Sequence, residues 1–335
     1  MPVREDTTAA PSPGARPPLP DAVPDVMTKA MTDAVHQRVI DWFSEAARDL
    51  PWRRPECTPW GVLVSEIMLQ QTPVVRVLPR WELWMQRWPT PADCAAADPA
   101  EILTVWDRLG YPRRALRLQS AAAAITSQHG GEVPQNAEEL RALPGIGEYT
   151  AAAVACFAFG APEVVVDTNI RRVHARVFSG AALPGPTYTA AQRRLAHELM
   201  PATHDDGGVR ACAWNAATME LGALICTARS PQCAICPVAD LCAWRAAGSP
   251  PPTDSQRTRG QAWQGTDRQV RGAIMAVLRQ RSPVAAAAVL EGLDLPEASA
   301  DQRRRCLDSL VADGLAVRAG EPGSAVEQIG LPGTV

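Results

Sequence analysis

The sequence predicts a mainly α-helical protein that ends in a small α+β module. Apolar residues recur at helical spacing along the body of the chain, and almost no alternating strand pattern occurs before residue 250. A break rich in Pro and Gly, at 248–265, precedes a C-terminal segment of different composition. The 335 residues are enough for two or three small domains with a sizeable core.

The composition argues against several classes of protein. Hydrophobic residues make up 46% of the chain, as in globular proteins, and no apolar run is long enough for a membrane span. The N-terminus lacks the apolar core of a secretory signal, so we expect a cytoplasmic protein. The net charge of −3 does not indicate a nucleic-acid partner, and any DNA-binding surface would have to be local.

The expected helices follow in chain order. Residues 1–28 are rich in Pro, Ala and Asp and are expected to be disordered. One amphipathic helix is predicted from Thr32 to Leu50, before Pro51, and a second from about Trp60 to Gln71. Further helices are predicted between the prolines Pro79, Pro89, Pro99, Pro112 and Pro134.

The segment Leu143–Gly147 predicts a helical hairpin. It joins a helix that starts near Ala137 to a helix predicted from Glu148 to about Phe159. Gly145 and Gly147 allow a tight turn, and the free amides that open the second helix form an anion site that grips a phosphate without reading sequence. A plain αα-hairpin turn is the alternative interpretation.

Beyond the linker at 248–265, the pattern predicts a separate module at 266–335. A helix is expected over Asp267–Arg281, followed by two more helical stretches and a hairpin at about Leu315–Leu331. This order suits a winged-helix-like module.

Four of the nine cysteines form a compact cluster. Cys226, Cys233, Cys236 and Cys242 have the spacing C-x6-C-x2-C-x5-C. In a reducing compartment such a group predicts a metal site rather than a set of disulfides. The spacing alone leaves a [4Fe–4S] cluster and a tetrahedral zinc both open.

Two carboxylates are predicted to have opposite surroundings. Glu66 has aliphatic neighbours at helical spacing, so its pKa should rise and leave it able to donate a proton, unless the helix turns it into water or pairs it with an arginine. Asp167 lies between the apolar run 164–166 and a helix predicted over 168–178, as an N-cap whose pKa should fall. By itself Asp167 suits structural capping, but the pair provides the acid and the anion that cleavage of an N-glycosidic bond needs.

Together these motifs resemble the helix–hairpin–helix DNA glycosylases of the endonuclease III superfamily, and most closely the MutY-type adenine DNA glycosylases. The resemblance covers about residues 34–247. It rests on the four cysteines and on the segments Leu50–Arg53, Ser65–Thr72, Arg108–Tyr111, Leu143–Thr150, Val166–Asn169 and Met219–Ala223.

The resemblance implies a two-lobed helical fold with a DNA groove between the lobes. A hairpin lobe of six helices would span 59–164, and a cluster lobe would combine 30–58 with 165–247. The cysteine spacing is that of the family, so the resemblance decides for a [4Fe–4S] cluster.

The implied activity is base excision repair of double-stranded DNA. The enzyme would flip out adenine mispaired with 8-oxoguanine or guanine and hydrolyse its N-glycosidic bond. Glu66 would protonate adenine at N7, and Asp167 would stabilise the oxocarbenium-like sugar. Tyr149 and Asn169 match positions that support the acid site, and Glu220 matches a residue that holds the adenine. Matching positions around the adenine are Arg48, Trp52, Arg53 and Leu69; those that wedge the duplex and contact the opposite purine are Gln71, Thr72, Leu109 and Tyr111.

Some of these residues also suit a purely structural role. Trp52 and Leu69 would fit a core, Gln71 and Thr72 a solvated helix end, and Tyr111 a buried loop position.

The lysine content predicts a monofunctional enzyme. Bifunctional relatives carry a lysine where this chain has Tyr149, and a Schiff base with the sugar needs an amine. Lys29 is the only lysine and lies at the N-terminal tail, so no lyase activity is expected. A monomer, associated with the nucleoid, is the default expectation.

The chain also departs from the family pattern. Thr168 stands where glycine is commonest, and Pro112 where a second tyrosine is common. Residues 257–335 are too short and too helical for the β-rich domain with which many relatives check for 8-oxoguanine, so that discrimination stays open. The alternatives are a glycosylase for another lesion, which Glu66 with Glu220 disfavours, and a non-catalytic DNA-binding protein, which Glu66 with Asp167 disfavours.

Overall fold

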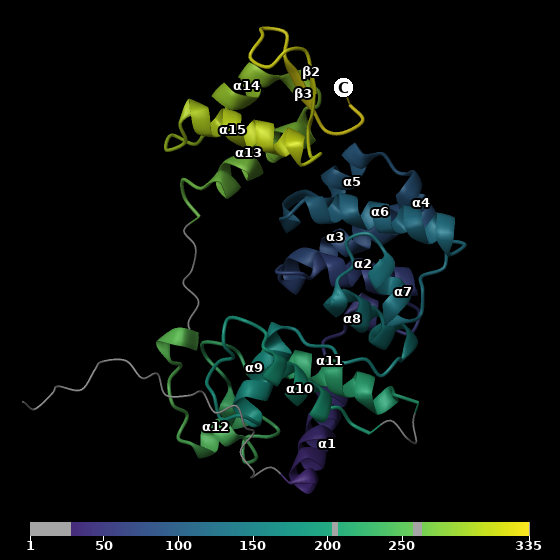
Figure 1. Cartoon of the computed structure of the whole chain (residues 1–335), viewed down its shortest axis with the longest axis vertical. Helices are drawn as coiled ribbons and strands as arrows, with labels where there is room; N and C mark the ends of the chain where they lie inside the picture. The colour runs from purple at the N-terminus through teal and green to yellow at the C-terminus, as the bar shows by residue number, and fades with distance from the viewer. Residues whose placement is uncertain (1–27, 203–206, 257–262, 335) are drawn as a thin grey trace, which may run out of the picture.

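The computed structural model describes residues 28–202, 207–256 and 263–334. The expected disorder of residues 1–28 falls, except for Thr28, outside the described residues. Along the long axis of the molecule, the C-terminal module, the segment 59–164 and the cysteine-bearing region follow one another (Figure 1). Among the described residues, no helix is long and apolar enough to cross a membrane.

The cysteine-bearing region is built around α11, against which α1 and α9 pack. Its apolar core includes Val35, Val39, Trp214 and Leu221. Thr28 caps α1, so Lys29 is the first residue of a helix. The expectation that Lys29 belongs to the N-terminal tail is therefore wrong. The elements of this region are α1 (Lys29–Ala46), the 3-10 turn η1 (Pro51–Arg53), α9 (Thr168–Val177), α10 (Ala190–Glu198), α11 (Val209–Leu224), η3 (Cys233–Ile235) and α12 (Ala243–Ala246).

The segment 59–164 holds seven α-helices, where six had been expected. Thr90 and Asp93 form a capping box that makes α4 a separate short helix before α5. Pro79 lies inside α3 and does not end a helix. A proline has no N–H for the carbonyl four residues earlier, which here belongs to Val75. Val75 is highly exposed, so its carbonyl can bind water instead. The elements are α2 (Pro59–Met68), α3 (Val74–Arg87), α4 (Pro91–Ala96), α5 (Pro99–Trp106), η2 (Asp107–Leu109), α6 (Arg113–Gln128), α7 (Ala137–Ala142) and α8 (Glu148–Phe159).

The C-terminal module has the element order expected of a winged helix. Its three strands form an antiparallel sheet in the order β1-β3-β2, in which Ile329 pairs with both Val284 and Arg318. The elements after the short turn η4 (Asp254–Gln256) are α13 (Asp267–Gln280), β1 (Val284–Ala285), α14 (Ala286–Glu291), α15 (Ala300–Ala312), β2 (Val317–Ala319) and β3 (Gln328–Gly330).

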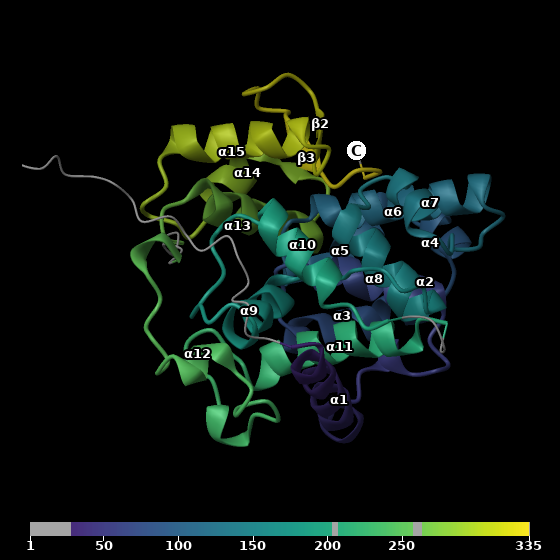
Figure 2. The same ribbon diagram turned by 60° about the horizontal axis from the view of Figure 1, so that its bottom comes forward.

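The C-terminal module is docked on the segment 59–164. Helix α13 lies near α5 in both views (Figures 1 and 2), and the apolar core of 59–164 continues into the module through residues such as Ile274 and Leu307. Arg279 donates to the carbonyl of Leu103 at 3.1 Å. The module is therefore packed against the protein body and is not a free tail.

The division into a hairpin lobe and a cluster lobe remains a proposal. The two larger apolar cores are compatible with it, with one difference. Leu50 and Trp52, which the division assigns to the cluster lobe, are buried in the core of the hairpin lobe. The chain therefore crosses between the lobes before residue 59.

Candidate active site and cluster site

Glu66 is a buried carboxyl on α2. Its side chain is 6% exposed, and Tyr149 from the neighbouring α8 forms a hydrogen bond with it. Burial raises the pKa of Glu66 to about 7, although the hydrogen bond from Tyr149 opposes this rise. The expected rise is confirmed, and Glu66 does not turn into water. At neutral pH a large fraction of Glu66 therefore carries a proton.

Asp167 caps the N-terminus of α9, as expected. Its Oδ1 accepts from the backbone N–H of Ile170 at 2.7 Å, and its Oδ2 accepts from the Asn169 amide at 2.7 Å. The expected fall of its pKa is wrong in direction: burial raises the pKa of Asp167, and the hydrogen bonds and Arg172 only oppose that rise. Capping is local and favours the anion, whereas burial of the carboxyl depends on the whole fold and outweighs it.

Glu220 on α11 is held by two arginines. Its carboxylate accepts from Arg48 Nε at 2.7 Å, from Arg48 Nη2 at 2.6 Å and from Arg53 Nη2 at 3.0 Å. Burial alone would raise its pKa, but these hydrogen bonds lower the pKa of Glu220 to about 2. The Nη1 of Arg53 is buried and has no partner among the described residues. The Nη1 of Arg53 is thus a hydrogen-bond donor without a partner, next to the ionised carboxylate of Glu220.

Thr72 and Leu109 belong to one packed junction between two loops. The Thr72 hydroxyl donates to the Leu109 carbonyl at 3.0 Å, and both residues are nearly completely buried. Arg114 ties the same loops together by donating to the carbonyls of Gln70 at 2.6 Å and Gly110 at 3.1 Å. Thr72 is thus not a solvated helix end, and Leu109 is too buried to wedge a duplex unless the loop moves.

Gln71 and Tyr111 are the exposed members of these loops. Both have the left-handed backbone conformation, with φ of 56° and 47°. Tyr111 is 46% exposed, so the alternative of a buried aromatic does not hold. These two side chains are available to a DNA duplex.

Trp52 and Leu69 contribute to packing. Trp52 is 7% exposed and makes an edge contact with Trp81, with ring centroids 5.6 Å apart. Leu69 is half-buried at the end of α2. The interpretation of Trp52 as a core residue is therefore correct.

The predicted helical hairpin is present between α7 and α8. Gly145 has φ of 76°, and a Cβ there would lie 2.8 Å from the Arg117 side chain. Gly147 is the N-cap of α8, without a side-chain cap and with open space around it. The first amides of α8 are therefore open to an anion.

A chain of hydrogen bonds connects Asp167 to the cysteine cluster. Asn169 bridges the Asp167 carboxylate and Arg172, and the guanidinium of Arg172 donates to the carbonyls of Gly222 at 2.6 Å and Cys226 at 2.7 Å. Gly222 allows α11 to lie close to α9, because a Cβ added at Gly222 would lie 2.7 Å from the Cβ of Asn169.

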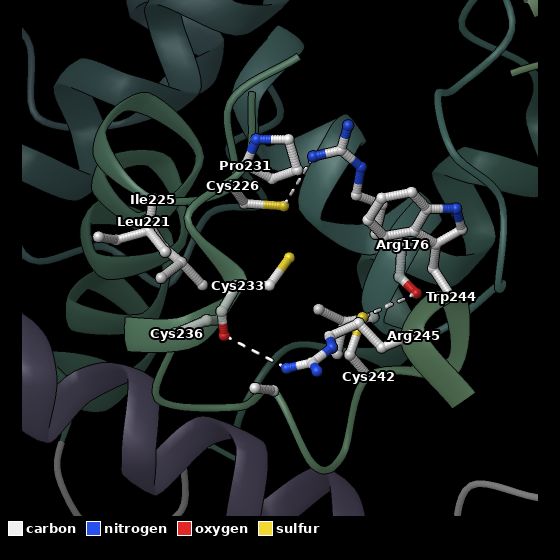
Figure 3. Close-up of a pocket in the computed structure, with 12 residues that line it drawn as sticks. Arg176, Leu221, Ile225, Cys226, Pro231, Cys233, Cys236, Cys242, Trp244 and Arg245 are labelled. Carbon is white, nitrogen blue, oxygen red and sulfur yellow. Dashed lines mark hydrogen bonds between the residues drawn. The ribbon is translucent and has the colours of Figure 1, made fainter. Parts of the chain in front are cut away.

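The four cysteines line one small pocket (Figure 3). Arg176 donates to the Cys226 sulfur at 3.3 Å, and Arg245 donates to the Cys233 carbonyl at 3.3 Å. In the described part of the chain, no three His, Cys, Asp or Glu side chains converge closely enough for a single metal ion. Four thiols around one pocket, with the guanidinium groups of Arg176 and Arg245 beside them, fit an anionic multi-iron cluster.

The sequence interpretation missed Arg114, Arg172 and Arg176. Their partners are mainly backbone carbonyls far away in the sequence, which no motif shows. The spacing of Arg172 and Arg176, one helical turn apart on the helix after Asp167, was the available signal.

Two known families match this chain. Residues 64–199 match the HhH-GPD superfamily of base excision DNA repair proteins, and residues 226–242 match the iron–sulfur binding domain of endonuclease III. The second range begins and ends on cysteines of the cluster. The match and the pocket together support a [4Fe–4S] cluster.

Several adenine DNA glycosylases are similar to this chain over most of its length. The adenine DNA glycosylase of Mycolicibacterium smegmatis is 50% identical over 277 residues, which cover 83% of this chain and 90% of that protein. The adenine DNA glycosylase of Mycobacterium tuberculosis (strain H37Rv) is 45% identical over 300 residues, covering 90% and 96%. The adenine DNA glycosylase of Homo sapiens is 41% identical over 223 residues, covering 64% and 40%.

Solved structures agree on the fold. A thermostable thymine-DNA glycosylase aligns with a TM-score of 0.57 and 29% identity, over 65% of this chain and 98% of that chain. Endonuclease III in a trapped covalent intermediate with DNA aligns with a TM-score of 0.56 and 24% identity, over 67% and 99%.

Proposed function

Because this chain belongs to the adenine DNA glycosylase family of base excision repair, we propose that it excises adenine mispaired with 8-oxoguanine or guanine. We further propose that it acts as a monomer on nucleoid DNA and hydrolyses the glycosidic bond without cleaving the strand. The observation that carries the proposal is the buried Glu66, whose pKa of about 7 suits a proton donor at neutral pH.

Glu66 is proposed to protonate N7 of the flipped adenine. Without a proton, adenine would have to leave as an anion, which is a poor leaving group; protonation of the ring lets it leave as the neutral base. Tyr149, hydrogen-bonded to Glu66, would hold the carboxyl in position and stabilise the carboxylate after proton transfer.

Asp167 is proposed to stabilise the positive charge that develops on the sugar. Its hydrogen bonds to Asn169 and to the Ile170 amide fix both oxygens and favour the anion against the effect of burial. A preoriented carboxylate in a partly dry site stabilises an oxocarbenium-like transition state without reorganisation. The same carboxylate would form a transient covalent bond to the sugar carbon as the bond to adenine breaks, and water would then displace it.

The Glu220, Arg48 and Arg53 cluster is proposed to recognise adenine. The unpartnered Nη1 of Arg53 is a donor for a ring nitrogen, and Glu220 is an acceptor for the exocyclic amino group. Because both oxygens of Glu220 already accept from arginines, adenine would share or displace one of these bonds. A base without a ring nitrogen and an amino group in these positions would break the same hydrogen bond without replacing it, so the site would favour adenine.

The [4Fe–4S] cluster would be held by Cys226, Cys233, Cys236 and Cys242. Bound there, it supplies a covalent crosslink among segments that otherwise carry little regular structure. Arg176 and Arg245 would offset its negative charge, and Arg172 would hold the loop of Cys226 in place beside α9.

Strand cleavage is not expected from the residues of the site. Tyr149 occupies the position on α8 beside Glu66, and Lys29 is exposed at the start of α1. A hydrolytic enzyme with this arrangement leaves an abasic site in an intact strand.

The proposal is tested by single-turnover base release on four duplexes. Adenine is placed opposite 8-oxoguanine, guanine or cytosine, thymine is placed opposite guanine, and each reaction is read with and without hot alkali. Breaks only at adenine opposite 8-oxoguanine or guanine, and only after alkali, are expected. Release of thymine, or breaks without alkali, would contradict the proposed specificity or the monofunctional mechanism.

A further inference from the structure

Arg268 of the C-terminal module contacts the loop of Tyr111. The guanidinium carbon of Arg268, from the first turn of α13, lies 5.0 Å from the ring centroid of Tyr111 and 5.5 Å from that of Trp263. Tyr111 is 46% exposed and Trp263 is 55% exposed. The cation is thus held between two aromatic faces that are themselves open to solvent.

Arg268 carries a charge that has no acidic partner. Within the described ranges it is exposed and forms no ion pair or hydrogen bond, whereas the adjacent Arg271 and Arg305 pair with carboxylates. An exposed guanidinium held in place by aromatic rings, with its charge free, has the chemistry that binds a nucleic-acid phosphate.

This side chain adjoins a series of basic residues that leads to the helical hairpin. Arg117 lies against Gly145 of the hairpin loop and is exposed, and Arg113, one turn earlier on α6, pairs with Asp313 of the C-terminal module at 3.1 Å. The hairpin loop, the start of α6 and the start of α13 are therefore linked by direct contacts.

We propose that Arg268 binds a phosphate of the DNA backbone, so that the C-terminal module extends the DNA-contact surface of the hairpin. Trp263 and Tyr111 hold the guanidinium in place for this contact. The inference rests on the proposed function only in that the chain binds duplex DNA; it does not depend on which base is excised.

A phosphate contact has a defined signature in the salt dependence of binding. Each neutralised phosphate adds about 0.9 to the slope of log affinity against log salt concentration. Arg268→Gln should therefore reduce that slope by about one, and weaken binding about fivefold to tenfold near 0.1 M salt. Arg268→Lys keeps the charge and should retain most of the slope.

The matched control is Arg281→Gln. Arg281 is exposed at the opposite end of the same helix, about 20 Å away at 1.5 Å per residue, and has no ion pair among the described residues. It should leave the slope unchanged. Thermal unfolding should be the same for both glutamine variants and the wild type, because neither side chain is buried.

The experiment measures the affinity of the cluster-loaded full chain for a short undamaged DNA duplex between about 50 and 200 mM salt. An undamaged duplex separates this test from the chemistry, since binding is read without base release. A slope for Arg268→Gln equal to the wild type, or an equal loss in Arg281→Gln, would overturn the proposal. Failure of adenine excision with the slopes as expected would instead count against the proposed function.

Discussion

Removing the Tyr149 hydroxyl should shift the pH dependence of base release upward. The hydrogen bond from Tyr149 stabilises the ionised form of Glu66 and lowers a pKa that burial has raised to about 7. A hydrogen bond to a charged group is worth about 1.5–3 kcal/mol, and one pKa unit corresponds to about 1.4 kcal/mol. Tyr149→Phe should therefore raise the pKa of Glu66 by about one unit or more.

The assay is single-turnover adenine release from pH 5 to 10, each profile normalised to its own plateau. Glu66 acts when protonated, so the rate falls as the pH rises through its pKa. At pH 8 the protonated fraction would rise from about a tenth to about half, a relative gain of about fivefold. Tyr188→Phe, which removes a hydroxyl from a tyrosine that makes no contact with Glu66, is the control and should leave the profile in place. An alkaline limb that stays fixed or moves down in Tyr149→Phe would refute the assignment of Glu66 as the acid.

Three further outcomes follow from the same contacts. Glu66→Gln should slow adenine release by about 10²–10⁴-fold while duplex affinity is kept, as gel-shift and single-turnover assays on one preparation would measure; a rate near that of the wild type would exclude general acid catalysis. Gly222→Ala should lower the free energy of unfolding in urea by about 1–3 kcal/mol, because the new Cβ would lie 2.7 Å from Asn169. The control is Gly272→Ala, which has open space around the added Cβ and should not lower the free energy of unfolding. Equal effects of the two substitutions would show that the close contact between Gly222 and Asn169 is unimportant. His174 is buried and its pKa is lowered to about 3, below the unfolded value of 6.5, so the stability linked to neutral His174 is complete above pH 6.5 and is lost as the pH falls towards 3. In the Glu66→Gln background, which removes the opposite titration of Glu66 over the same interval, urea unfolding should show about 2 kcal/mol less stability at pH 5 than at pH 7. A stability at pH 5 equal to or above that at pH 7 in this background would contradict the sign.

The elements that the sequence predicted best are those with local stop and start signals. Helix α8 has the predicted bounds, and α9 begins after the predicted cap at Asp167. Caps and glycines act within one turn of the chain, so they are readable without tertiary information. Helix α1, in contrast, ends at Ala46, four residues before the predicted Leu50, because its last predicted turn instead faces Glu220 through Arg48.

The prediction succeeded for Glu66 and failed for Asp167 for a related reason. The sequence places aliphatic residues at helical spacing around Glu66, so a raised pKa could be expected from its own helix. For Asp167, local capping alone suggested a lowered pKa, whereas burial raises it. The extent to which the fold buries a side chain is information that a single sequence does not contain.

The arginines that hold the site together were outside the reach of the sequence for the same reason. Arg114 reaches carbonyls on the loop after α2, and Arg172 reaches carbonyls at the end of α11. Any exposed helix in this arginine-rich chain offers similar side chains, so only the fold distinguishes these from solvated ones. The same applies to Arg268, whose significance depends on the docking of the C-terminal module.

The central claim is that this chain hydrolyses adenine from a mispair by using Glu66 as the acid. The most direct measurement is mass spectrometry of the products formed by the cluster-loaded protein on a duplex with adenine opposite 8-oxoguanine, in parallel with Glu66→Gln. Free adenine and an intact strand with one abasic site, both nearly absent in the variant, are the predicted result. No free adenine from a preparation that binds the duplex, or an equal yield from Glu66→Gln, would contradict the account.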